Sequence, residues 1–180
     1  MPEVNELYRG AARSGTHWYY ERQVDRYAMA RTAAERGQSA VLDGDPLQPL
    51  WYNWIYPEFG PLVDVVDFFS HAMRTGRIRF PDCYVVLGTS ATALRTRKER
   101  DETRRRRNFE RHLNLIEPQR RYFEALRSEG GVTVHFLQNN EVNDTLQQVA
   151  RLEALGTVKD TDALRAVAAW LSTHPAPSPA

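Results

Sequence analysis

Three short apolar runs divide the chain, at residues 39–43, 83–87 and 132–137. Each run is bounded by turn-forming residues such as Gly, Pro or Asp, a pattern typical of a buried strand. Before, between and after these runs, apolar residues recur at helical spacing in six segments: 16–36, 61–75, 94–112, 118–129, 143–155 and 161–172. Strands that alternate with helices indicate an α/β domain built on a parallel sheet.

Several helix boundaries carry their own signals. Gly37 and Gly76 follow the first two helical segments, where glycine commonly ends a helix in the left-handed conformation. Thr89 and Ser90 precede the third segment and are good N-cap residues. Pro118 suits the first turn of the fourth helix. These signals predict where the helices begin and end.

The composition is that of a globular chain with a formal net charge of only +1 over 180 residues. This length favours one domain, which we place at residues 1–173, followed by a disordered Pro-rich tail at 174–180. No apolar run approaches the ~20 residues of a membrane span, and the first residues lack the pattern of a signal peptide. We therefore expect a cytoplasmic protein without a membrane partner.

Some site classes have no support in the sequence. The five histidines are scattered without a spacing that suits metal ligation, so no zinc site is predicted. No Gly-x-Ser-x-Gly motif or Cys/His nucleophile arrangement occurs. The only cysteine, Cys83, lies in an apolar run and is interpreted as a small core residue.

Two carboxylates stand where the first predicted strand ends, in the turn Asp43-Gly44-Asp45-Pro46. Open α/β sheets bind ligands at the carboxyl ends of their strands. Trp51 and Tyr52 follow in an aromatic-rich loop, and flat rings beside acids would suit Mg²⁺ and a ring-bearing substrate. An ordinary turn with aromatic core residues explains the same pattern, because Asp and Gly are common in turns.

Arginines crowd the third helical segment. Arg97, Arg100, Arg104, Arg107 and Arg111 follow one another at spacings of three and four, which predicts one stripe on a single helix. Guanidinium groups bind phosphate bidentately, so the stripe indicates an anionic ligand. A solvated helix face is the alternative. Neither segment 16–36 nor the last third of the chain extends the patch, which favours a small phosphorylated ligand over nucleic acid.

The order of these parts resembles the P-loop nucleoside and nucleotide kinases, closest to the deoxynucleoside kinase and thymidylate kinase group. The matching pieces are the aromatic-rich segment 17–27, the acidic turn 42–45, the Pro-Asp-containing strand 79–87 and the arginine run 95–107. The similarity spans roughly residues 1–137, and it rests on the order and spacing of the pieces.

The resemblance implies a three-layer parallel sheet flanked by helices, with an arginine-rich lid at about residues 94–112. It also implies ATP and Mg²⁺ as cofactors and a small hydroxylated or phosphorylated acceptor. The roles it implies are a general base (Glu3), lid groups that stabilise the transferring phosphoryl (Arg97, Arg100, Arg104, Arg107), contacts to the acceptor (Trp18, Tyr19, Arg22, Trp51, Tyr52) and metal carboxylates (Asp43, Asp45). The family's acidic motif is commonly Asp/Glu-Arg-Ser, and this chain lacks that Arg and Ser.

One departure from the family concerns the phosphate-binding loop. The chain contains no Gly-x-x-x-x-Gly-Lys-Ser/Thr motif and no Gly-Lys pair at all. That loop supplies the backbone cradle and the lysine for the β- and γ-phosphates. In the family it follows a first, central strand, ahead of the part that this chain resembles. We therefore expect the chain to lack that strand and the donor site, and to be inactive as numbered. A missing native N-terminus and a regulatory homologue that has lost catalysis are the two explanations that stay open.

The predicted function is phosphotransfer from ATP to a small acceptor such as a nucleoside or nucleotide. The alternative is a non-enzymatic binding module whose arginine-rich helix docks RNA or an acidic partner. A steep loss of affinity with salt across many sequences would indicate RNA binding. The identity of the acceptor and the oligomeric state stay open, with a homodimer as one option.

Overall fold

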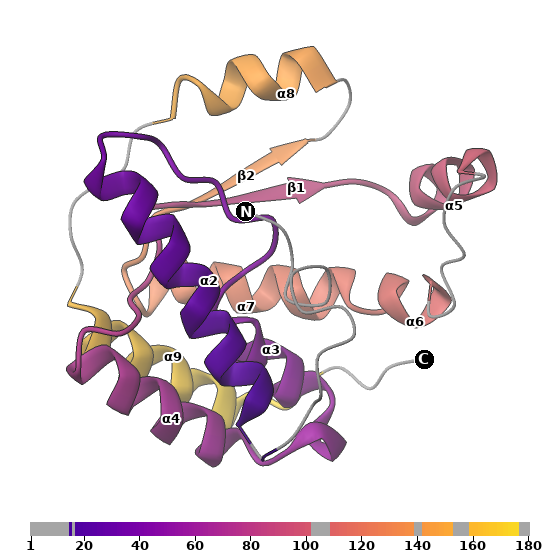
Figure 1. Ribbon diagram of the computed structural model, residues 1–180. Helices are drawn as coiled ribbons and strands as arrows, with labels where there is room; N and C mark the ends of the chain where they lie inside the picture. The colour runs from indigo at the N-terminus through magenta and orange to yellow at the C-terminus, as the bar shows by residue number, and fades with distance from the viewer. Residues whose placement is uncertain (1–14, 16, 102–108, 139–141, 153–158, 177–180) are drawn as a thin grey trace. The chain divides into compact units, whose positions relative to one another are not determined.

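The computed structural model describes residues 15, 17–101, 109–138, 142–152 and 159–176. The chain divides into two compact units, Met1–Phe80 and Pro81–Ala180. The described residues form a mixed α/β protein that is mostly helical, with a two-stranded parallel sheet in the second unit (Figure 1). The predicted α/β class is thus confirmed.

All the regular elements in the described residues of the first unit are helices. Its elements are α2 (Trp18–Glu35), α3 (Gln48–Ile55), the short 3₁₀ helix η1 (Pro57–Phe59) and α4 (Leu62–Arg74). Helix α4 packs against both α2 and α3. Leu47, Leu50, Val65 and Phe69 are fully buried and form the centre of the core. Burying a side chain of this size contributes about 1.5–3 kcal/mol, so these positions hold the helices together.

Two helices of this unit end in the same way. After α2, Gly37 has φ +75° and donates its N–H to Ala34, while Gln38 donates to Ala33. After α4, Gly76 has φ +69° and donates its N–H to Met73, while Arg77 donates to Ala72. The left-handed conformation suits glycine, and this pair of bonds satisfies carbonyls that the helix leaves open. Both predicted glycine stops are confirmed.

The predicted strand at 39–43 is wrong. Residues 38–42 have no regular secondary structure, and Val41 is 75% exposed. The apolar run is only three residues long, and in the described part of this unit no strand is present to pair with it. The carbonyl of Asp43 instead accepts a hydrogen bond from the side chain of Arg26.

Helix α3 stands where we expected an aromatic-rich loop, so this prediction is also wrong. The sequence Gln-Pro-Leu-Trp-Tyr-Asn-Trp-Ile is rich in residues of modest helix propensity. Tertiary packing overrides that propensity, because Leu50, Trp51, Trp54 and Ile55 are all buried. Pro49 lies in the first turn, where a proline costs no hydrogen bond.

The second unit is organised around two parallel strands, β1 (Tyr84–Gly88) and β2 (Val134–Gln138) (Figure 1). Tyr84 pairs with Val134, and Gly88 pairs with Gln138. These strands confirm the predictions at 83–87 and 132–137 to within two residues. The helices of the unit are α5 (Ala91–Arg100), α6 (Phe109–Leu113), α7 (Ile116–Ser128), α8 (Val142–Val149) and α9 (Asp160–Thr173).

Helix α7 is the centre of the core of this unit. It packs against both β2 and α9, and its Tyr122 and Leu126 are fully buried. The ring of Phe123 lies 5.2 Å from that of Tyr84 on β1, centroid to centroid. Gly130, just after α7, has no room for a side chain, since a Cβ there would lie 2.7 Å from the Leu126 carbonyl oxygen. The end of α7 therefore packs backbone against backbone.

The predicted single helix at 94–112 is interrupted. Helix α5 begins at its predicted cap, where the Ser90 hydroxyl accepts a hydrogen bond from the Ala93 N–H at 3.1 Å. It ends at Arg100, because Asp101 is extended with φ −90° and ψ 91°. Residues 102–108 lie outside the described residues, and α6 starts at Phe109. Arg97 and Arg111 are thus not on one helical stripe.

Candidate functional site

Buried polar side chains gather between α2 and the segment that follows it in the first unit. Gln23, Arg26, Asp45 and Asn53 are all at least 90% buried. Buried polar groups are costly unless they are hydrogen-bonded, so their partners define the geometry of this region. We call the α2–α3 contact with these four residues the polar seam.

Hydrogen bonds across the polar seam join α2 to α3. The Tyr19 hydroxyl donates to Gln48 Oε1 at 2.8 Å. The Asn53 side-chain amide donates to the Tyr20 hydroxyl at 3.1 Å and to the Gly60 carbonyl at 3.2 Å. Burial raises the pKa of Tyr20, and the hydrogen bond from Asn53 partly offsets this. Tyr20 therefore stays a neutral phenol over the whole physiological pH range.

Arg26 is a feature of the polar seam that we did not predict. It is only 1% exposed, and its guanidinium donates to Gln23 Oε1 at 2.8 Å and to the Asp43 carbonyl. Residues 23, 26, 27 and 30 follow the i, i+3, i+4, i+7 spacing of a buried helix face. That spacing, with Tyr27 and Ala30 on the same face, could have revealed the burial of Arg26.

The two predicted metal carboxylates have different surroundings. Asp45 is buried, and its carboxylate accepts hydrogen bonds from the Leu47 N–H at 2.8 Å and from Trp51 Nε1 at 3.1 Å. These bonds fix the turn before α3, as Asx turns commonly do. The side chain of Asp43 is exposed. Metal binding by either residue stays a prediction.

The part of the chain that the structure describes contains no ready-made group of metal ligands. Nowhere in it do three His, Cys, Asp or Glu side chains form a group that could hold a metal ion. A magnesium ion there would need water or substrate oxygens as further ligands, which is usual for this ion.

The predicted acceptor contacts all lie on α2 and α3. The Arg22 guanidinium bonds Asp25 at 2.9 Å, and its carbon lies 5.9 Å from the ring centroid of Trp18. On α3, the rings of Trp51 and Tyr52 meet edge to face at 5.9 Å. The structure thus connects Tyr19 with α3 and Asp45 with Trp51, whereas Arg22 pairs within its own helix.

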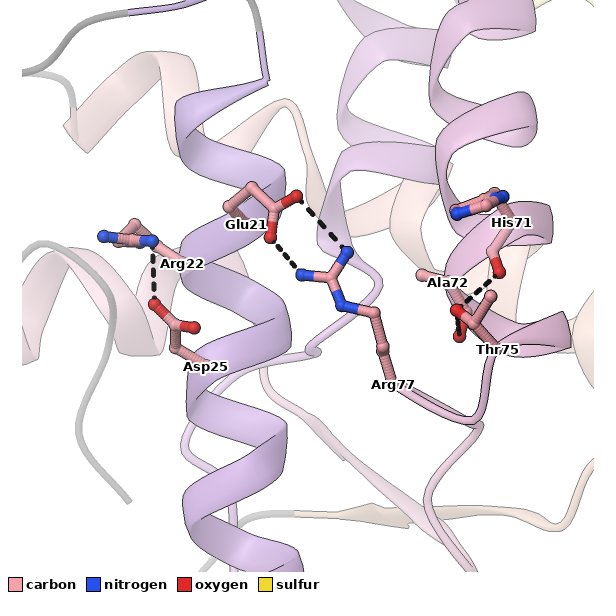
Figure 2. Close-up of polar contacts among 7 residues, drawn as sticks. All are labelled: Glu21, Arg22, Asp25, His71, Ala72, Thr75 and Arg77. Carbon is pink, nitrogen blue, oxygen red and sulfur yellow. Dashed lines mark hydrogen bonds and ion pairs between the residues drawn. The ribbon is translucent and has the colours of Figure 1, made fainter.

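Figure 2 shows that α2 carries ion pairs on two of its sides. Arg22 bonds Asp25 on one side, and Glu21 meets Arg77 in a two-pronged pair on another. The hydrogen bond from Arg77 to Glu21 raises the pKa of the guanidinium. The Thr75 hydroxyl donates to the carbonyls of His71 and Ala72, which closes the last turn of α4. These contacts hold the end of α4 against α2.

In the second unit, the described candidate arginines lie on the helix that follows the carboxyl end of β1. Gly88 and Gln138 end the two strands as a register pair, and a Cβ on Gly88 would lie 3.4 Å from the Gln138 amide nitrogen. From Gly88 the chain runs through Thr89 and Ser90 directly into α5 (Figure 1). Helix α5 carries the exposed side chains of Arg97 and Arg100. Glu3, Arg104 and Arg107 lie outside the described residues.

Two other cations of α5, Arg95 and Lys98, contact α6. Arg95 Nη2 lies 3.0 Å from Glu110 Oε2, and Lys98 Nζ lies 3.9 Å from Glu110 Oε1. Lys98 Nζ is also 4.4 Å from the ring centroid of Phe109, within the range of a cation–π contact. Phe109 is buried and Glu110 is exposed. A single surface carboxylate therefore bridges two cations of α5.

Comparison with models of protein families, with curated proteins and with solved structures gives no match to this chain. None of the helices within the described ranges is both long and apolar enough to cross a membrane.

Proposed function

We propose that the protein is a P-loop-kinase-like phosphotransferase that moves the γ-phosphate of ATP to a small acceptor such as a nucleoside or nucleotide. The proposal includes a three-layer α/β sheet of which β1 and β2 are two neighbouring strands. One observation carries it. A parallel strand, β1, leads at its carboxyl end through a short Gly-Thr-Ser connection into a helix rich in arginine (Figure 1).

This arrangement suits phosphate for two physical reasons. In open α/β sheets, ligands bind beside the carboxyl ends of the strands. Arginine presents several N–H donors in a plane and holds its charge at every physiological pH, so it stabilises a transferring phosphoryl group. Arg97 and Arg100 extend from α5, the helix that β1 leads into, and are the residues we assign to that role.

The polar seam of the first unit supports the acceptor side of the proposal. Tyr19 and Tyr52 bring partly exposed rings with polar edges onto α2 and α3, and such rings recognise ring-bearing ligands. Trp51 is buried and donates to Asp45, so it supports these residues from the core. Asp43 fits a Mg²⁺ ligand because its carboxylate is exposed. Asp45 is less suited to this role, because it is buried and both its oxygens already accept hydrogen bonds from the protein. Bound Mg²⁺ would neutralise phosphate charge.

The sequence lacks the residues that bind the phosphates of ATP, the phosphoryl donor, in P-loop enzymes. Because the sequence has no Gly-Lys pair, its residues do not form the lysine-containing loop that cradles the β- and γ-phosphates in P-loop enzymes. The proposal therefore assigns residues for the acceptor and for the transferring phosphoryl group, and assigns none to the ATP tail.

The test combines binding with turnover. Thermal unfolding is measured with nucleosides, nucleoside monophosphates and ATP at millimolar concentration, with and without Mg²⁺, and phosphorylated product is followed with γ-labelled ATP. A ligand at a hundredfold excess over its Kd stabilises the folded chain by about 2.7 kcal/mol. We expect one class of acceptor to raise the unfolding temperature. Any product formed in the presence of Mg²⁺ would show that ATP binds without the lysine-containing loop and that the chain is active as numbered.

Paired variants locate the site. Arg97→Gln with Arg100→Gln should abolish product formation, whereas Arg120→Gln with Arg165→Gln removes the same charge from other exposed positions and should have no effect. No acceptor binding and no product in any condition would contradict the proposal. RNA affinity that falls steeply with salt, without preference for a small ligand, would support the binding-module alternative.

A further inference from the structure

Helix α5 presents its cations as two pairs. Arg95 and Lys98 are three residues apart, as are Arg97 and Arg100. With 3.6 residues per turn, the members of each pair lie about 60° apart around the helix axis, and the two pairs lie on roughly opposite sides. Only the pair of Arg97 and Arg100 has a role in the proposed function, so the pair of Arg95 and Lys98 needs its own explanation.

Glu110 occupies the pair of Arg95 and Lys98. Its two carboxylate oxygens are divided between the two cations, at 3.0 Å from Arg95 Nη2 and 3.9 Å from Lys98 Nζ. The adjacent residue, Phe109, holds Lys98 from its ring face. Two cations that converge on one carboxylate have the spacing that an oxyanion such as a phosphate group also uses.

The contact with Glu110 is weak enough to be exchanged. The side chains of Arg95, Lys98 and Glu110 are 52%, 39% and 62% exposed, so water and salt screen their attraction. A carboxylate brings one negative charge, whereas a pyrophosphate group brings at least two and more acceptor oxygens. A phosphorylated ligand therefore has the stronger attraction to this pair.

We propose that Arg95 and Lys98 form a phosphate site that Glu110 fills in the free chain, so that Glu110 is an internal competitor of the ligand. The inference rests on the proposed function, because it concerns the helix that binds the transferred phosphate. It adds a second anion site on the other side of α5. The ligand class is a polyphosphate group, as carried by a nucleoside di- or triphosphate.

The experiment measures the Kd of inorganic pyrophosphate for the full chain by calorimetry at low salt. Glu110→Gln keeps the shape of the side chain and removes its charge, and it should tighten pyrophosphate binding by about 3–10-fold. The matched control is Glu124→Gln, which breaks an exposed Arg–Glu pair of similar length, 2.9 Å to Arg120, and changes the net charge equally. It should leave the Kd within about twofold of the parent chain.

A double variant assigns the gain to the proposed site. Adding Arg95→Gln to Glu110→Gln should remove the gain, and 300 mM salt should reduce it, because the interaction is electrostatic. Unchanged or weaker binding by Glu110→Gln would overturn the inference, and so would an equal gain in both glutamate variants.

This result is separable from the proposed function. A gain in pyrophosphate affinity with neither acceptor binding nor phosphoryl transfer would support the anion site and contradict the phosphotransferase. Phosphoryl transfer without a gain in affinity would support the enzyme and overturn the role of Glu110.

Discussion

The two units place their polar groups in opposite ways. The first unit encloses Gln23, Arg26, Asp45 and Asn53 between helices, where each makes hydrogen bonds to the protein. The second unit surrounds an apolar centre at α7 and keeps the charges of α5 and α6 at the surface. Buried polar groups are expensive to disturb, whereas exposed ion pairs are weak. The buried polar groups of the first unit thus fix the positions of its helices, whereas the charges of α5 and α6 in the second unit are accessible to a ligand.

The largest effect should come from removing the buried arginine. Arg26→Met leaves Gln23 Oε1 and the Asp43 carbonyl without their donor, and each lost buried bond costs about 1–3 kcal/mol. We expect unfolding in urea to show a loss of about 2–4 kcal/mol. Arg31→Met is the matched control, since Arg31 also donates to a carbonyl, that of Gly76, but is exposed. Its loss should stay below about 1 kcal/mol, and equal losses would contradict the comparison.

The next effect tests the apolar centre of the second unit. Gly130→Ala places a methyl group 2.7 Å from the Leu126 carbonyl oxygen, a backbone atom that cannot turn away. We expect a loss of about 1–3 kcal/mol in thermal or urea unfolding. Gly88→Ala is the control, because the nearest atoms to its methyl group are those of the Gln138 amide at 3.4 Å and beyond. If both variants lose the same stability, close packing at the end of α7 is not the cause.

A smaller difference should separate the two carboxylates of the turn. Asp45→Ala removes the acceptor for the Leu47 N–H and for Trp51 Nε1, which should cost about 1–2 kcal/mol. Asp43→Ala removes an exposed side chain and should change stability by less than about 0.5 kcal/mol. Circular dichroism melting curves would measure both. A larger loss for Asp43→Ala would refute the structural role of Asp45.

The smallest effect concerns the reactivity of Cys83. Burial raises the pKa of its thiol, and the charge of Asp82 raises it further. At pH 8 the folded chain should therefore react with a thiol reagent more slowly than the urea-unfolded chain. The reaction rate of the folded chain should also level off at a higher pH than that of the unfolded chain, because its thiol pKa is higher. Asp82→Asn should speed the reaction only partly, because burial remains. The raised pKa also links the stability of the fold to pH. The free energy of unfolding is unaffected by this thiol below its unfolded-state pKa, and it falls as the pH rises from there through the folded-state pKa.

Local signals in the sequence predicted much of the fold. Strands β1 and β2, the glycine stops at Gly37 and Gly76 and the cap at Ser90 each depend on a few neighbouring residues. The strand at 39–43 failed because an apolar run becomes a strand only where a partner strand is available. Helix α3 was missed because packing of its tryptophans, and not their propensity, makes it helical.

The candidate site could be predicted only in part. The sequence placed Tyr19, Asp45 and Trp51 in one functional group, and the structure connects Tyr19 to α3 and Asp45 to Trp51. Arg26 escaped because arginine is usually exposed, although its helical spacing matched the buried face. Glu110 was not predicted because it contacts Arg95 on another helix, and a local sequence pattern does not indicate a contact between two helices.

The parallel pairing of β1 with β2 has a consequence for the order of folding. Tyr84 and its partner Val134 are 134 − 84 = 50 positions apart, so their pairing closes a long loop. Closing such a loop in a flexible chain costs about 3.5 kcal/mol of entropy, apart from a constant. Helix α7 lies inside that loop and packs on β2, so its early formation shortens the flexible part. We therefore expect strand pairing to be a late event in refolding, and its rate to depend on how readily α7 forms.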